Sequence, residues 1–285
     1  MRVFESYLSF IKKHESHPFE YLNHQMTYRL LGKGDRVILI LMGSSMFPTE
    51  SYFKIIEPLA ESHRILTINY PHEIQTIVEL TELVKGLIDF LSIPRLTIFG
   101  ASHGGSFAQA FAYEYPKVVE SLILYNTLTN TTHMNVGSNQ MISDVLAVVE
   151  ELEKLRKVMP LDSVKGVFLE QVEQAIKDES EIDLFEYMIS KYTEQDEQLQ
   201  MRLIKSFLKT YVFEKDDFEY LNHKVLILYG HDNDPFGGTD LIETLVELFG
   251  NPKLEFIDSD RFSLIVNAEE LVEKVETFIN EKPLN

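Results

Sequence analysis

Cysteine is absent from this chain of 285 residues, and basic residues are few. The lack of cysteine excludes disulfides, thiolate nucleophiles and every metal site that needs sulfur. Lys and Arg total 26 against 45 Asp and Glu, which gives a formal net charge of −19. Nucleic acids and anionic bilayers would be repelled by most of such a surface, so we expect neither as a partner.

Long hydrophobic runs are also missing. The longest, such as residues 37–42, are far shorter than the roughly 20 apolar residues of a membrane-spanning helix. Residues 1–23 mix charged with apolar positions and contain no signal-peptide apolar core. We therefore expect a cytoplasmic protein.

Short continuous apolar runs alternate with longer segments of helical periodicity. Such runs are typical of strands buried on both faces of a parallel sheet. The predicted strands are residues 36–42, 64–69, 95–99, 121–125, 224–229 and 253–257. The predicted helices between them are residues 49–61, 74–91, 103–115, 239–249 and 268–279. This order predicts an α/β fold, a mostly parallel sheet with helices on both faces. Residues 26–31 are predicted to form an antiparallel hairpin with the strand that begins near Val37.

Residues 129–222 interrupt this alternation. Their apolar residues recur at helical spacing and no strand-like run appears among them. We interpret the segment as a helical lid inserted into a core formed by residues 1–128 and 223–285. The lid is expected to cover whatever site the sheet presents.

The most informative motif lies where the predicted strand 95–99 meets the next helix. Gly100-Ala-Ser102-His-Gly104 is a G-x-S-x-G sequence between a buried strand and a helix, the setting of a nucleophile elbow. Ser102 would present its hydroxyl at the helix N-terminus, and both glycines would allow the strand and helix backbones to approach. A dinucleotide-binding loop would need glycine at position 102. A serine that only caps the helix is the remaining structural alternative.

With this elbow the chain resembles the α/β-hydrolase fold family. The resemblance implies an oxyanion loop at residues 41–46 and an oxyanion hole formed by the backbone N–H of His103 and one from Ser44 or Ser45. It also implies an acid on the Gly230-His-Asp-Asn-Asp-Pro235 loop, which is similar to the family's Gly-x-x-Asp-Pro signature with one residue inserted. Asp234 is the preferred acid and Asp232 the alternative.

The base histidine of the family is missing from its usual place. Arg261 stands there, between an upstream strand and Phe262, and no histidine follows His231 in the sequence. Arginine stays protonated and cannot accept the proton of Ser102. His231, on the acid loop, and His133, at the start of the lid, are the possible substitutes; the side chain of His103 is expected to leave along its helix.

One branch of the family is similar in these departures. The segment from about residue 64 to 132 resembles the maspardin-like branch, which also lacks the usual histidine and is regarded as interacting with proteins. Two functions are therefore open. One is a serine hydrolase acting on a small ester, thioester or amide, with no cofactor and no metal. The other is a catalytically degenerate relative that binds a small ligand or a partner protein.

Overall fold

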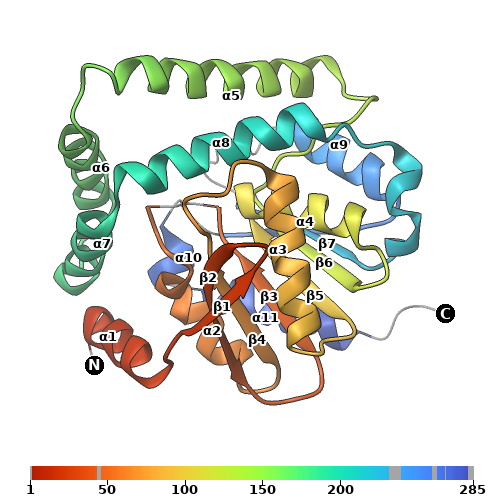
Figure 1. Ribbon diagram of the computed structural model, residues 1–285, viewed down its shortest axis with the longest axis horizontal. Coiled ribbons are helices and arrows are strands. Elements are labelled where there is room, and N and C mark those ends of the chain that lie inside the picture. The colour runs from red at the N-terminus through yellow and green to blue at the C-terminus, as the bar shows by residue number, and fades with distance from the viewer. Residues whose placement is uncertain (1, 44–45, 231–238, 259–261, 267, 282–285) are drawn as a thin grey trace.

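The chain folds around one eight-stranded sheet, shown in the computed structural model of Figure 1. The structure describes residues 2–43, 46–230, 239–258, 262–266 and 268–281. The strand order is β1-β2-β4-β3-β5-β6-β7-β8; β1 and β2 are antiparallel to their neighbours and the other pairs are parallel. The strands are β1 (His17–Tyr21), β2 (His24–Gly32), β3 (Val37–Leu41), β4 (Arg64–Asn69), β5 (Leu96–Ala101), β6 (Val119–Tyr125), β7 (Val225–Gly230) and β8 (Lys253–Ile257).

The continuous apolar runs form the middle of this sheet. Every residue of β3 and of β5 is buried, because helices cover both faces. All six strands expected from such runs are present, and they lie in one mostly parallel sheet. The central strands therefore owe their place to burial on both sides.

The predicted hairpin between residues 26–31 and β3 is wrong. Strand β4 lies between them, with β2 antiparallel to β4 and β3 parallel to it. A run that is apolar at every position needs two covered faces, which only the inside of the sheet offers, so β3 pairs with β4 and β5 instead. The connection after β2 crosses close to the chain before β4: a Cβ added to Gly32, whose φ is +90°, would lie 2.2 Å from the carbonyl oxygen of His63.

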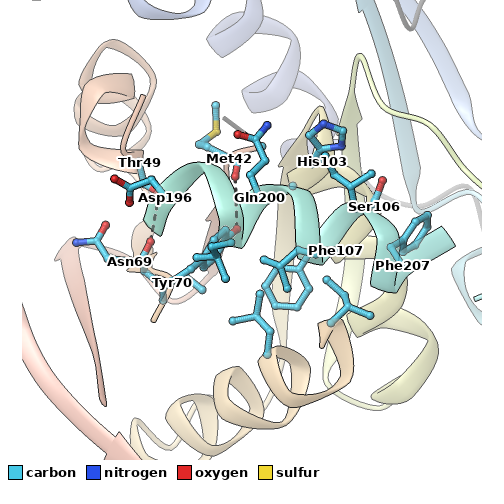
Figure 2. A pocket seen from close by; sticks show the side chains of 18 of the residues that line it. Met42, Thr49, Asn69, Tyr70, His103, Ser106, Phe107, Asp196, Gln200 and Phe207 are labelled. Atoms are coloured by element: carbon cyan, nitrogen blue, oxygen red, sulfur yellow. Dashed lines mark hydrogen bonds between the residues drawn. The ribbon is translucent and has the colours of Figure 1, made fainter. Parts of the chain in front are cut away.

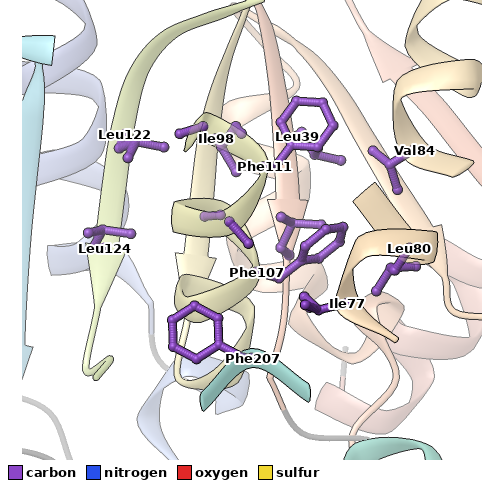
Figure 3. Close-up of a cluster of buried hydrophobic side chains, with 14 of the residues drawn as sticks. Leu39, Ile77, Leu80, Val84, Ile98, Phe107, Phe111, Leu122, Leu124 and Phe207 are labelled. Carbon is purple, nitrogen blue, oxygen red and sulfur yellow. The ribbon is translucent and has the colours of Figure 1, made fainter. Parts of the chain in front are cut away.

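Two layers of helices cover the sheet and separate its apolar side chains into two clusters. One face is covered by α3 (Ile77–Phe90), α4 (His103–Glu114) and α9 (Thr239–Phe249); Figure 3 shows side chains of α3 and α4 over Leu39, Ile98 and Leu122. The other face is covered by α1 (Val3–Lys13), α2 (Phe53–Leu59), α10 (Ser263–Val266) and α11 (Glu269–Asn280). We call these the α4-side and α2-side clusters. None of the described helices is long and apolar enough to cross a membrane.

The segment 129–222 is helical along most of its length. It forms α5 (Val136–Leu155), α6 (Leu161–Ala175), α7 (Glu179–Lys191), α8 (Glu194–Thr210) and the short 3-10 helix η2 (Lys215–Leu221). Its buried residues join both clusters: α5 and α8 contribute to the α4-side cluster, whereas α6 and α7 contribute to the α2-side cluster. Figure 1 shows α8 passing over one end of the sheet, with α5 outside it.

Candidate active site

Ser102 occupies a strained turn between β5 and α4. Its φ of 53° and ψ of −124° lie where serine is rarely found, and such strain costs about 1–3 kcal/mol. Its backbone is held on both sides, since its N–H donates to the Tyr125 carbonyl at 2.9 Å and its carbonyl accepts from the Thr127 hydroxyl at 2.6 Å. The Ser102 side chain makes no capping hydrogen bond to α4. The interpretation of Ser102 as only a helix cap is therefore wrong.

Glycines allow the end of β3 to contact this turn. A Cβ added to Gly104 would lie 2.0 Å from the carbonyl oxygen of Leu41, and one added to Gly43 would lie 2.3 Å from the backbone nitrogen of His103. The predicted oxyanion loop thus begins directly against the first turn of α4. Ser44 and Ser45, the other predicted donors, lie outside the described residues.

His103 lines a cavity beside the elbow, although its side chain was expected to leave along the helix. Burial lowers the pKa of His103 from 6.5 to about 4, so the imidazole is neutral at pH 7. Figure 2 shows its ring near Ser106 on the same side of α4. A neutral imidazole here adds no charge to the cavity.

The remaining predicted residues are distributed differently. His133 is 73% exposed, and its Nε2 lies 3.4 Å from the Glu214 carboxylate rather than in the cavity wall. His231, Asp232, Asp234 and Arg261 lie outside the described residues.

The strand that leads into the predicted acid loop lies close to the elbow. The N–H of Gly230, the last residue of β7, donates to the Asn126 side chain at 2.9 Å, and the Tyr229 hydroxyl donates to the Thr127 carbonyl at 2.7 Å. Thr127 also donates to Ser102. Tyr229, near the end of β7, is therefore connected to Ser102 through Thr127 by two hydrogen bonds.

The cavity has a volume of about 300 Å³ and lies between the elbow and α8. Its wall comes from the loop after β3, the end of β4, α3, the start of α4 and one face of α8, as Figure 2 shows in part. The side chains contributed by α8 are Asp196, Leu199, Gln200, Leu203, Ile204, Phe207 and Leu208. Sequence reasoning expected a site beneath segment 129–222 but did not identify these lining residues, for which the apolar periodicity of residues 199–208 was a signal.

Two carboxylates belong to the cavity wall. Glu50 lies 3.5 Å from the guanidinium of Arg29, and both side chains are largely buried. Asp196 contacts the His72 imidazole at 2.7 Å. No group of three or more His, Asp or Glu side chains among the described residues is arranged to hold a metal ion.

Solved structures share this architecture over nearly their whole length. A hydrolase from Pseudomonas aeruginosa superposes with a TM-score of 0.71 at 15% identity, over 94% of this chain and 99% of that chain. The enol-lactonase from Burkholderia xenovorans superposes with a TM-score of 0.70 at 16% identity, over 93% of this chain and 100% of that chain. The chain has the α/β-hydrolase fold. No protein-family model matches it.

Two curated relatives of this α/β-hydrolase-fold chain match less than half of it, and a third matches most of it. Proline iminopeptidase PfmaB of Pestalotiopsis fici is 31% identical over 120 residues, 38% of this chain and 43% of that protein. Maspardin of Danio rerio is 30% identical over 107 residues, 36% of this chain and 34% of that protein, which confirms the local resemblance. The 2-hydroxy-6-oxononadienedioate/2-hydroxy-6-oxononatrienedioate hydrolase of Paraburkholderia phymatum is 24% identical over 257 residues, 80% of this chain and 81% of that protein. The chain spans less than half the length of the first two.

Proposed function

We propose that this protein is a serine hydrolase that acts on a small ester, thioester or amide, with Ser102 as the nucleophile. The observation that carries the proposal is the backbone of Ser102, which is held in a strained conformation while its hydroxyl is not used to cap α4. Strain of this kind is maintained at sites where a side chain must be presented to a reactant. The adjacent cavity gives the acyl group of a substrate a place to bind.

In this proposal the Ser102 oxygen attacks the acyl carbon and forms an acyl-enzyme as the leaving group departs. The backbone N–H of His103, with one from Ser44 or Ser45, stabilises the negative charge on the acyl oxygen. Water then attacks the acyl-enzyme, releasing the acid and restoring the Ser102 hydroxyl. Segment 129–222 acts as the lid, because its helix α8 forms one wall of the cavity.

The proton of Ser102 needs an acceptor. Asp234, or Asp232 in its place, would orient that acceptor, and His231 is the proposed one because it follows β7 directly, and β7 is bonded to the elbow's neighbour Thr127. His133 is a weaker candidate, since it faces Glu214 in solvent.

A second function is favoured by one observation. Arg261 stands where a base is expected and no histidine follows residue 231, which is the pattern of a catalytically degenerate protein that binds a ligand or a partner protein. Loss of a triad base costs about 10⁴-fold or more in rate. Arg261 would then pair with the acidic loop or hold an anionic ligand.

Labelling by a fluorophosphonate probe separates the two functions. Strong labelling of the wild type that is lost in Ser102→Ala supports the hydrolase and contradicts the degenerate alternative. Labelling that is absent in the wild type and appears in Arg261→His contradicts an intact hydrolase and places the defect at position 261. Ser143→Ala is the matched control, because Ser143 is an exposed serine on α5 outside the cavity and should not affect labelling.

A further inference from the structure

Residues 125–127, at the end of β6 and directly after it, contact both the elbow and the end of β7. Strand β6 lies between β5 and β7, parallel to both, so the carboxyl ends of the three strands lie side by side (Figure 1). On one side, the Tyr125 carbonyl accepts from the Ser102 N–H at 2.9 Å, and the Thr127 hydroxyl donates to the Ser102 carbonyl at 2.6 Å. We call residues 125–127 the bridge segment. It holds the backbone of the proposed nucleophile.

On its other side, the bridge segment holds the end of β7. The N–H of Asn126 donates to the Leu228 carbonyl at 3.0 Å, and the Asn126 side-chain oxygen accepts from the Gly230 N–H at 2.9 Å. The Tyr229 hydroxyl donates to the Thr127 carbonyl at 2.7 Å. Because Gly230 is the last residue of β7, Asn126 fixes the point from which the chain leaves that strand.

Asn126 has a backbone conformation that few residue types tolerate. Its φ is +43°, in the left-handed region, where glycine and asparagine are the residues most often found. Glycine would suit the backbone but would offer no acceptor to the Gly230 N–H. Asparagine supplies both, and its side chain joins two positions that are 104 residues apart in the sequence.

We propose that Asn126 is a positioning residue that sets where the loop after Gly230 begins relative to Ser102. The inference rests on the proposed function, in which His231 and an acid of that loop serve Ser102. None of the described residues that line the cavity belongs to the bridge segment. A change at Asn126 should therefore slow the chemical step and leave substrate binding unchanged, because a displaced catalytic group costs rate even when the substrate still binds.

Asn126→Gly tests this role in the full chain, because glycine accepts the backbone conformation and removes the side-chain acceptor. With p-nitrophenyl acetate as the ester, kcat should fall by at least about tenfold while KM stays within about twofold. Asn126→Asp keeps an oxygen acceptor and should hold kcat within about threefold of the wild type. Asn23→Gly is the matched control: Asn23 has a φ of +63° in the exposed turn between β1 and β2, and neither constant should change.

Two measurements report on the same contact without turnover. The Gly230 amide should exchange with solvent about fivefold faster in Asn126→Gly, because it loses its acceptor. The imidazole NMR signals of His231, assigned with His231→Gln, should shift in Asn126→Gly and stay in place in Asn23→Gly.

A second variant covers the case in which Asn126→Gly does not fold. Serine occurs at positive φ in this chain at Ser92 and Ser102, so Asn126→Ser suits the backbone. The serine oxygen is one bond closer to the backbone than the asparagine oxygen and does not reach the Gly230 N–H. Asn126→Ser should therefore lower kcat and shift the His231 signals as Asn126→Gly does.

The outcomes separate this inference from the proposed function. Unchanged His231 signals in Asn126→Gly, or an unchanged kcat in an active protein, would overturn the positioning role and leave the hydrolase standing wherever the wild type is active. A rise in KM that matches the fall in kcat would overturn it too, because the cavity would then be damaged. A wild type that neither hydrolyses the ester nor labels with fluorophosphonate, but whose His231 signals shift in Asn126→Gly, would contradict the hydrolase and leave Asn126 as the residue that places the loop.

Discussion

Helices α7 and α8 follow one another in the chain but are held by different kinds of contact. Helix α7 buries Phe185 completely, with its ring 5.4 Å from that of Phe47 and 5.3 Å from that of Phe262. Helix α8 also buries apolar side chains, Leu199 and Phe207 among them, but part of its apolar face lines the cavity. Polar contacts join it to the loop after β4: Asp196 pairs with His72, and Arg202 donates to the carbonyls of His72 and Ile74.

This difference indicates which part of segment 129–222 opens first. Separating α7 from the α2-side cluster exposes its apolar side chains to water, and the free energy rises with the area exposed. The polar contacts of α8 can be exchanged for water, and the cavity beneath it means that fewer packing contacts are lost. We therefore expect α8 to open locally while α7 stays in place.

The largest expected effect is on α7. Phe185→Ala should lower the free energy of unfolding by about 3–5 kcal/mol, because a fully buried aromatic ring leaves a cavity. Unfolding in guanidinium chloride measures this change. Val167→Ala on α6, where Val167 is 55% exposed, should change the stability by less than about 0.5 kcal/mol. Equal losses in the two variants would mean that α7 is not anchored by its aromatic packing.

Lowering the pH should lower the free energy of unfolding, because His103 is buried in the wall of the cavity. The pKa of His103 is lowered to about 4 in the fold, so between pH 6.5 and 4 the unfolded chain takes up a proton that the folded chain does not. The free energy of unfolding therefore falls as the pH falls through this range, by about 3 kcal/mol from this group. Urea unfolding at pH 7 and pH 4.5 should show a smaller loss for His103→Gln than for the wild type. His133→Gln, at an exposed site, should behave like the wild type; identical losses in all three proteins would contradict the assignment.

A smaller effect is expected from the polar contacts of α8. Arg202→Met removes donors to two carbonyls of the loop after β4 and should cost about 1–2 kcal/mol. Hydrogen exchange should become faster by about tenfold for amides of α8 and stay unchanged for those of α7. Lys205→Met is the control, since its exposed pair with Glu153 should contribute little. Faster exchange in both helices would show that they open as one unit.

The sequence predicted the parts of the fold that local pattern determines. Continuous apolar runs identified the inner strands, and G-x-S-x-G placed Ser102 between β5 and α4. Strand β1 was missed because only Phe19 of its five residues is buried, so no run of apolar residues marks it. The hairpin was mispredicted because pairing within a sheet depends on which strands are buried on both faces, and sequence proximity does not decide that.

The cavity could not be predicted in the same way. Glu50 and Leu203 line it from positions about 150 residues apart, and only tertiary packing brings them together. Arg29, which lies 3.5 Å from the Glu50 carboxylate, is on β2, and β2 pairs with β1 and β4 but not with β3, the next strand in the sequence. Ser102 and His103 of the candidate site were predicted, whereas the residues of α8 that line the cavity were not.

The glycine at position 104 has a consequence for redesign of this protein. Because any Cβ there would overlap the carbonyl of Leu41, no side chain fits at position 104 between the elbow and the end of β3. A library intended to reshape the cavity should leave Gly43, Gly100 and Gly104 untouched and place its diversity on α8. There the side chains face open volume, and a new shape can be tried without displacing the serine.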